Sequence, residues 1–317
     1  METAKKYWQF SEVNKIYTQP LHDLLYEAHT VHKANHPANT IKIAQLLSIK
    51  TGACPEDCGY CSQSGHHNTI IEKHKLMDVD TVLEHARQAK ANGAKRFCMG
   101  AAWRNPPEKE MPKLKQMIHE VKALGLETCM TLGMLTGEQA HELKDAGLDY
   151  YNHNIDTSPS YYNKVVTTRT FDDRLDTIKK VSEAGMQVCC GGILGLGETQ
   201  NDRVEFVMTL ANMEPQPLSV PINQLVRFEG TPLAHKERID NFEIVRTIAT
   251  ARILLPQSFI RLTAGRIDMS EELQALCFFA GANSVFTADK MLTCDSINQK
   301  EKDDVLFTKL GLNALPA

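Results

Sequence analysis

AGMQVCCGG, residues 184–192, places a glycine directly before a short run of strand-forming residues. Glycine is typical of a helix C-terminus because it adopts the left-handed backbone conformation at little cost. The same order of helix-like segment, glycine and strand-like run recurs in four other stretches: NGAKRFCMG (92–100), LGLETCMTL (124–132), AGLDYYNHN (146–154) and AGANSVFTA (280–288). Helices that alternate with strands in this way predict a parallel sheet.

Three further segments have the composition of strands: 44–50, 218–226 and 259–265. Together with the five glycine-headed runs they make eight, which favours an α/β fold of the (β/α)8 TIM-barrel type over an open doubly wound sheet. Pro221 weakens 218–226 as a central strand. Helical spacing predicts a helix over 81–92, and Thr136 with Gln139 predicts a capping box. We expect an N-terminal helical extension over 1–40, the barrel over 41–293 and a C-terminal closing segment over 294–317.

Composition excludes several functional classes. The 317 residues are 42% hydrophobic and carry a formal net charge of −4, which argues against a nucleic-acid partner. The sequence contains no apolar run long enough to span a membrane and no secretory signal, so we expect a cytoplasmic protein. Nine cysteines in a reducing compartment indicate ligands, nucleophiles or buried thiols rather than disulfides.

The stretch ACPEDCGYCSQSG, residues 53–65, carries Cys54, Cys58 and Cys61 directly after the first predicted strand. In barrels, active sites lie at this end of the strands. A structural zinc site needs four ligands, which His66 and His67 could complete. Three thiolates also suit a four-iron cluster with one open iron, which can bind and activate a small molecule.

Three more cysteines, Cys98, Cys129 and Cys189, occupy nearly the same place in successive repeats, so they should lie at similar depth in the barrel. A single strand cysteine is more often a small buried residue than a ligand. Three at equivalent depth favour a second metal site. They could bind a two-iron cluster if another group supplied the fourth ligand, which the sequence pattern alone does not identify.

In the stretch 151–156, strand alternation places Asn152, Asn154 and Asp156 on one face and residues 151, 153 and 155 on the other. Unpaired polar groups inside a barrel would cost a few kcal/mol. These side chains should therefore bond to one another or to a polar ligand.

The spacing Cys-x3-Cys-x2-Cys, with Tyr60 before the last cysteine, resembles that of the radical S-adenosylmethionine enzymes. The segment Gly191-x-Ile193-x-Gly195-x-x-Glu198 resembles the strand along which adenine lies in that superfamily. The resemblance implies a [4Fe-4S] cluster whose open iron chelates S-adenosyl-L-methionine. An electron from the cluster would cleave this cofactor to methionine and a 5′-deoxyadenosyl radical.

A closer resemblance, roughly from residue 9 to 312, is to the biotin synthase family. It is carried by TGACPEDCGYCSQS, RFCMGAAWRNP, YYNHNIDTSP, CGGILGLGE and RLTAGR. It implies a [2Fe-2S] cluster held by Cys98, Cys129, Cys189 and Arg261. It also implies a sulfurtransferase activity in which that cluster donates sulfur to C6 and C9 of dethiobiotin, forming biotin.

The same resemblance assigns further contacts. Asn154 and Asp156 would meet the ribose of S-adenosylmethionine, and Arg174 its methionyl end. Asn152 and Asn223 would lie near the ureido ring of dethiobiotin. No catalytic residue is implied beyond the cluster ligands.

We also expect a homodimer, an electron donor such as flavodoxin or ferredoxin, and iron–sulfur assembly machinery as partners. Two alternatives remain. One is another sulfur-inserting enzyme of the lipoyl synthase kind, although no second clustered cysteine motif occurs here. The other is a non-enzymatic iron–sulfur carrier.

Two features depart from the family pattern. Cys190 stands where a small residue such as serine is common, and strand alternation turns it away from Cys189, so we expect it to pack in the core. The stretch FTADKMLTC, residues 286–294, also differs, which leaves the contacts to the substrate carboxylate undefined. Cys277 and Cys294 are expected to be buried thiols.

Overall fold

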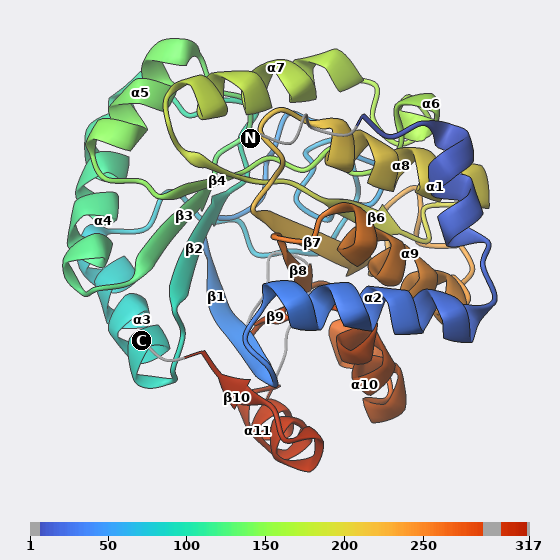
Figure 1. Cartoon of the computed structure of the whole chain (residues 1–317). Coiled ribbons are helices and arrows are strands. Elements are labelled where there is room, and N and C mark those ends of the chain that lie inside the picture. The colour runs from blue at the N-terminus through green and yellow to red at the C-terminus, as the bar shows by residue number, and fades with distance from the viewer. Residues whose placement is uncertain (1–6, 288–298, 316–317) are drawn as a thin grey trace.

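Parallel strands close into a barrel with helices around its outside (Figure 1). The computed structural model describes residues 7–287 and 299–315, and all structural statements refer to them. The strands are β1 Thr40–Lys50, β2 Arg96–Ala101, β3 Glu127–Thr131, β4 Tyr150–Asn152, β5 Gln187–Cys189, β6 Gly192–Leu194, β7 Ser219–Gln224, β8 Phe259–Leu262, β9 Ser284–Phe286 and β10 Asn313–Ala314. Pairing of β1 with both β2 and β9 closes the ring.

The helices follow the strands in alternation. They are α1 Phe10–Tyr17, α2 Leu21–Asn35, α3 Val79–Ala91, α4 Met111–Ala123, α5 Gly137–Asp145, α6 Pro159–Tyr162, α7 Phe171–Glu183, α8 Gln200–Asn212, α9 Asn241–Leu254, α10 Glu271–Phe279 and α11 Gln299–Leu310, with the 3-10 turns η1 Glu108–Glu110 and η2 Arg266–Asp268. All five glycines of the sequence repeat have positive φ, between 76° and 109°. The predicted capping box of Thr136 and Gln139 is present at the start of α5.

Two short strands share one position of the barrel. Cys189 of β5 pairs with Ser219, and Gly192 of β6 pairs with Ile222, so both lie along β7. Because β10 joins the start of β1 outside the ring, the ring has eight strand positions. The predicted TIM-type barrel is therefore confirmed.

Pro221 lies inside the barrel wall, although its presence had weakened the prediction of this strand. It faces the interruption between β5 and β6, where a Cβ atom on Gly191 would approach the carbonyl oxygen of Pro221 to 1.9 Å. A proline without an N–H group is tolerated here because the neighbouring strand is interrupted opposite it.

Several element boundaries differ from expectation. β1 begins at residue 40 rather than 44, because Thr40 and Ile41 pair with β10 from the far end of the chain. β8 ends at Leu262, and the left-handed Gly265 (φ 81°) leads into η2. The helix expected over 81–92 begins two residues earlier, at Val79, and ends at Ala91.

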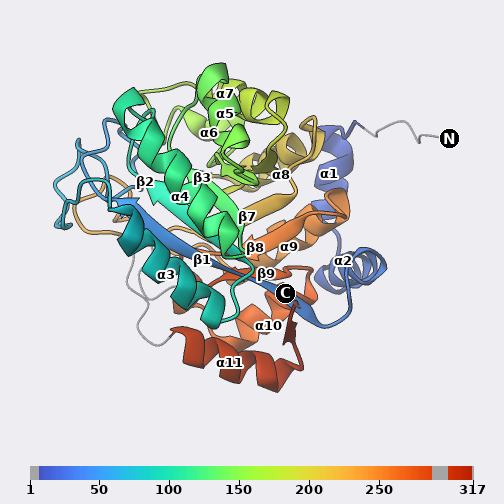
Figure 2. The same cartoon turned by 90° about the vertical axis from the view of Figure 1, so that its left-hand side faces the viewer.

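The segments outside the barrel pack on its surface. The loop after β1 projects at one end of the barrel, beyond the tip of the β1 arrow, while α1 and α2 lie toward the opposite side (Figure 2). In the core, Cys190 and Cys277 are fully buried, as expected. Cys294 and the stretch 288–294 lie outside the described residues. Within the described part of the chain, no helix combines the length and apolar character needed to cross a membrane.

Candidate active site

One cavity of about 260 Å³ lies inside the barrel toward the carboxyl ends of the strands. It is lined by two groups of cysteines that are far apart in the sequence. We call Cys54, Cys58 and Cys61 the loop trio, and Cys98, Cys129 and Cys189 the strand trio. All six, together with Arg261, line this single cavity.

The loop trio lies on irregular backbone that folds back on itself. The Cys54 N–H donates to the Gln63 carbonyl (3.0 Å), and the Gly65 N–H donates to the Cys54 carbonyl (2.7 Å). A tight turn follows, in which the Cys61 N–H donates to the Cys58 carbonyl (2.9 Å). These bonds bring the three thiols to one side of the loop. Cys58 is buried, while Cys54 and Cys61 are half-buried.

Charged side chains surround the loop trio. Arg169 donates from Nη2 to the sulfur of Cys58 (3.3 Å). Burial raises the pKa of Cys54 and Cys58, and raises that of Cys61 to about 12. A bound metal reverses this tendency because it takes thiolates. The nearby Arg169 guanidinium lowers the cost of such charge at Cys58.

Glu56 connects the same loop to Thr168 and Arg104. Its buried carboxylate accepts from the Thr168 hydroxyl and pairs with Arg104 at 3.1 Å. Sequence reasoning missed Glu56 and Arg169. The only indication in the sequence is that Glu56 lies within the cysteine loop and that Arg169 follows two threonines shortly before α7. The zinc alternative is not favoured, because the Nε2 atoms of His66 and His67 contact the carbonyl oxygens of Pro55 and Cys58.

The strand trio is formed by strand register. Cys98 and Cys129 are paired directly across β2 and β3. The Cys129 thiol shares hydrogen bonds with both Cys98 and Cys189, and all three cysteines are buried. Cys189 pairs with Asn152, which lies two positions after Tyr150, the partner of Cys129. The three thiols nevertheless line one cavity, in agreement with the similar depth expected from the sequence.

Arg261 meets the strand trio from β8. Its Nε donates to Ser284 Oγ (2.9 Å), and the side chain is fully buried. Its two terminal nitrogens have no hydrogen-bond partner among the described residues. A buried guanidinium with free nitrogens in a cavity lined by three thiols fits a further ligand site.

An iron–sulfur cluster suits these donor sets better than a single ion. No three described His, Cys, Asp or Glu side chains are arranged to hold one metal ion. A cluster offers several iron atoms, so its ligands do not have to converge on one point. Both trios therefore fit clusters in their donor chemistry.

A second buried arginine lies beside the strand trio. Arg96 precedes Cys98 by two residues on the same strand face, and its guanidinium stacks 3.3 Å from the Tyr150 ring centroid. Its Nε donates to Glu127 (3.0 Å), which also pairs with Lys42 at 2.8 Å. Sequence reasoning missed Arg96, although its spacing to Cys98 was a usable signal.

The polar row 152–156 lines the cavity, although β4 itself ends at Asn152. The Asn154 side-chain oxygen accepts from Asn152 Nδ2 and from the Gly191 N–H, both at 3.1 Å. Asp156 forms a buried ion pair with Arg174. His153 also lies on the cavity wall rather than on the opposite face, because the strand alternation ends with β4.

The glycine-rich segment lies along the cavity only at its start. Ile193 lines the cavity beside Tyr60. Gly191 is held by Asn154 and approaches Pro221 too closely for any side chain. Gly195 and Glu198 lie farther along, in a turn outside the cavity lining, where the Gly195 N–H donates to both Glu198 oxygens (2.9 and 3.1 Å).

Two threonines orient the candidate substrate residues. Thr131 donates to the Asn152 side-chain oxygen (3.2 Å), and Thr263 donates to that of Asn223. Asn223 Nδ2 in turn donates to the Gly192 carbonyl (2.9 Å). Both pairs line the cavity from opposite sides of the β5–β6 position. The threonines carry no motif, so sequence reasoning did not identify them.

Comparisons with known proteins agree with this arrangement. Residues 48–210 match the radical SAM superfamily, and residues 221–313 match the biotin and thiamin synthesis associated domain. Among solved structures, methylornithine synthase (PylB) superposes with a TM-score of 0.83 at 17% identity, covering 98% of this chain and 95% of that one. The hydrogenase maturase HydG from Carboxydothermus hydrogenoformans also gives a TM-score of 0.83, at 16% identity, covering 98% and 76%. These two likenesses concern the fold.

Sequence relatives are much closer. A biotin synthase of Legionella pneumophila (strain Paris) is 67% identical over 315 residues, which cover 99% of this chain and 100% of the relative. A biotin synthase of Pseudoalteromonas translucida is 58% identical over 306 residues, covering 96% and 88%. With this identity over nearly its whole length, the chain belongs to the biotin synthase family of the radical SAM superfamily.

Proposed function

We propose that this protein converts dethiobiotin to biotin by inserting sulfur between C6 and C9. The observation that carries the proposal is that two distinct cysteine trios face one cavity, which is also lined by two threonine-anchored asparagines. A radical source and a sulfur source must both reach the same substrate, and a shared cavity meets that requirement.

The two trios would hold different groups. Cys54, Cys58 and Cys61 would bind a [4Fe-4S] cluster, and Cys98, Cys129, Cys189 and Arg261 a [2Fe-2S] cluster. When bound, the first would supply the electrons that cleave two molecules of S-adenosylmethionine to 5′-deoxyadenosyl radicals, each taking one hydrogen atom from C9 or C6, and the second would supply the sulfur atom that joins these carbons. The C–H bonds at C6 and C9 of dethiobiotin are unactivated and resist acid–base chemistry. The protein's own task is therefore to bind and orient the substrate and to shield the radicals from solvent.

The residues around the cavity would perform that task. S-adenosylmethionine would contact residues from the loop, the polar row, α7 and the glycine-rich segment, namely Tyr60, Asn154, Asp156, Arg174, Gly191, Ile193, Gly195 and Glu198. Asn152 and Asn223 would bind the ureido ring. Because Thr131 and Thr263 donate to their oxygens, the two amide groups are held in fixed orientations before substrate arrives.

Arg169 and Arg96 would stabilise negative charge on the two trios. Arg169 donates to Cys58 at 3.3 Å, and Arg96 has two buried terminal nitrogens without a partner among the described residues. Cations and N–H donors beside thiolates favour the charged state that iron requires.

Further proposals concern the protein's context. We propose a cytoplasmic homodimer that receives electrons from a flavodoxin or ferredoxin and iron from the assembly machinery. We divide the chain into a helical extension (1–40), a radical SAM barrel (41–293) and a C-terminal segment (294–317). A lipoyl-synthase-like activity and a carrier role are less well supported, because the sequence contains no second clustered cysteine motif and a carrier needs no cavity lined by oriented asparagines.

The test is anaerobic incubation of the reconstituted protein with dethiobiotin, S-adenosylmethionine and a reductant. We expect biotin and 5′-deoxyadenosine, both detected by mass spectrometry. Octanoyl-peptide substrate in place of dethiobiotin is the control for lipoyl-type activity. Sulfur insertion only into that control, or S-adenosylmethionine binding too weak to measure, would refute the proposal.

A further inference from the structure

The turn that follows β6 depends on one buried carboxylate. The side chain of Glu198 is only 2% exposed and accepts the Gly195 N–H with both oxygens. Gly195 has φ 92°, a conformation that other residues rarely adopt. The turn directly follows the strand whose Ile193 side chain lines the cavity. Glu198 therefore anchors the turn that follows β6, two residues after the cavity-lining Ile193.

A buried carboxylate needs a cation, because an unpaired one costs several kcal/mol. Arg203 of α8 supplies it. Its Nη1 lies 3.3 Å from Glu198 Oε1 and 3.2 Å from the Glu198 carbonyl oxygen. Its Nη2 donates to Glu243 of α9 at 2.6 Å. One guanidinium thus pairs with two carboxylates.

The remaining nitrogen of Arg203 connects to the N-terminal helix. Its Nε donates to the hydroxyl of Tyr17 (3.1 Å), which itself donates to Glu243 (2.8 Å). Tyr17 is the last residue of α1 and is fully buried. A continuous chain of bonds therefore runs from α1 through Arg203 and Glu198 to Gly195.

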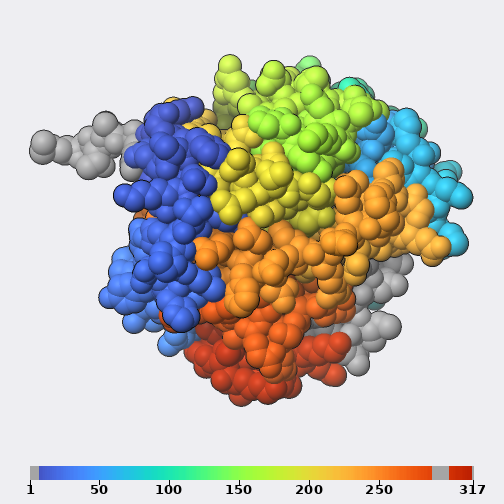
Figure 3. All heavy atoms as spheres, turned by 90° about the vertical axis from the view of Figure 1, so that its right-hand side faces the viewer, coloured from blue at the N-terminus to red at the C-terminus, as the bar shows by residue number. Residues whose placement is uncertain are grey.

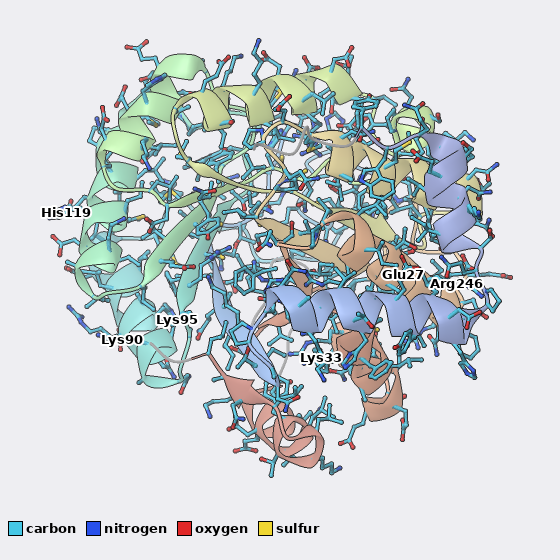
Figure 4. All side chains as sticks on the ribbon, in the orientation of Figure 1. Glu27, Lys33, Lys90, Lys95, His119 and Arg246 are labelled. Carbon is cyan, nitrogen blue, oxygen red and sulfur yellow. The ribbon has the colours of Figure 1, made fainter. Side chains whose placement is uncertain are left out.

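The N-terminal helix is fixed to the barrel at both ends. Trp8 and Asn212 exchange two hydrogen bonds at 2.9 Å. At the other end, Arg246 donates to the carbonyls of Tyr17 (2.9 Å) and Gln19 (2.7 Å). Figure 3 shows the N-terminal helices lying directly on the α8 and α9 surface. Figure 4 labels Arg246 beside the start of α2, away from the barrel axis.

We propose that Tyr17 and Arg203 are positioning residues for the nucleoside end of the S-adenosylmethionine site, so that α1 forms part of that site although it does not line the cavity. This inference rests on the proposed function. Without the Arg203 cation, the buried Glu198 side chain would leave its place, and the Gly195 N–H would lose its acceptor. Arg174, which we assign to the methionyl end, forms no hydrogen bond or ion pair with Tyr17, Arg203 or Glu198 among the described residues.

The test compares two variants with a matched control. Arg203→Met removes the cation, and Tyr17→Phe removes only the hydroxyl. Arg246→Met is the control, because it weakens the docking of the same helix but has no contact with Glu198. Binding of S-adenosylmethionine, 5′-deoxyadenosine and methionine to the cluster-loaded proteins is measured by anaerobic calorimetry, together with the melting temperature of each protein.

We expect Arg203→Met to bind S-adenosylmethionine and 5′-deoxyadenosine about fivefold to tenfold more weakly, a usual size for coupling between linked sites, with methionine affinity unchanged. Tyr17→Phe should show a smaller loss of the same kind, and Arg203→Lys should recover part of the affinity. Arg246→Met should lower the melting temperature only.

Unchanged nucleoside affinity in folded Arg203→Met would overturn the inference. If Arg203→Met fails to fold, unchanged nucleoside affinity in Tyr17→Phe would overturn it. An equal loss in Arg246→Met would also overturn it, since helix docking alone would then explain the effect. Failure of the wild-type protein to bind S-adenosylmethionine would instead refute the proposed function.

Discussion

The loop trio lies on irregular backbone between β1 and α3, whereas the strand trio lies on β2, β3 and β5 of the barrel wall. Two loop cysteines are half-exposed, and the loop is held mainly by its own backbone bonds and by contacts of Glu56 and Arg169. The strand cysteines are buried and fixed by sheet register. The loop trio is therefore more accessible to solvent than the strand trio.

The strongest test of this difference removes the whole loop trio. Replacing Cys54, Cys58 and Cys61 by alanine should abolish both 5′-deoxyadenosine and biotin, because no radical source remains. Iron should fall from about six to about two per chain, with only the two-iron spectrum left. Iron analysis and visible absorption check this. Retention of all the iron would show that the loop holds no cluster.

The opposite change separates the two products. Cys129→Ala should stop biotin formation, because the thiol that contacts both other members of the strand trio is lost. The loop and the ribose contacts are untouched, so 5′-deoxyadenosine should still form when dethiobiotin is present. The measurement is the ratio of the two products. A normal ratio in this variant would mean that sulfur comes from elsewhere.

A smaller effect is expected at the ribose contact. Asp156→Asn keeps the shape but removes the charge that pairs with Arg174. Losing a charged hydrogen-bond partner costs about 1–3 kcal/mol, so S-adenosylmethionine affinity should fall by about fivefold to 150-fold. Both products should fall together, unlike in Cys129→Ala. If biotin fell more than 5′-deoxyadenosine at saturating S-adenosylmethionine, Asp156 would act in sulfur transfer rather than in cofactor binding.

The smallest effect tests the orientation of neighbouring cysteines. Cys190 packs in the main hydrophobic core, while Cys189 lines the cavity. Cys190→Ser should keep biotin formation within about twofold and lower stability by roughly 1–3 kcal/mol, because a buried hydroxyl replaces a thiol. Cys189→Ala should abolish biotin. Equal activity loss in folded preparations of both variants would show that Cys190 is also used.

The two trios were predictable to different degrees. The loop trio could be predicted from its local spacing, and the strand trio from its recurring place after the repeat glycines. Arg261 was reached only by resemblance, because it lies 72 positions after Cys189 and belongs to no local pattern. The barrel followed from the repeat as well.

Other features could not be predicted because they depend on tertiary contacts. The split of β5 from β6 arises where Gly191 meets Pro221 from another strand. Arg169 reaches Cys58 across 111 positions, and Tyr17 meets Arg203 across 186. Pairings between segments far apart in the chain leave no periodic signal in a single sequence. Thr131 and Thr263 are likewise ordinary strand-end residues until the fold places them beside asparagines.

Closure of the barrel between β1 and β9 has a consequence for biosynthesis. Ser284 donates to the Lys42 carbonyl across 242 positions, so the ring closes only when almost the whole chain has left the ribosome. Synthesis from Cys189 to Ser284 takes about 5–20 s at usual elongation rates. During that time the strand cysteines are present without the closing strand, and for the first 72 positions also without Arg261. We expect thiol labelling of stalled nascent chains to modify Cys98 and Cys129 until residue 284 has emerged. Any cluster that the strand trio binds would then be inserted after translation, whereas the three cysteines of the loop trio are all present once residue 61 is exposed.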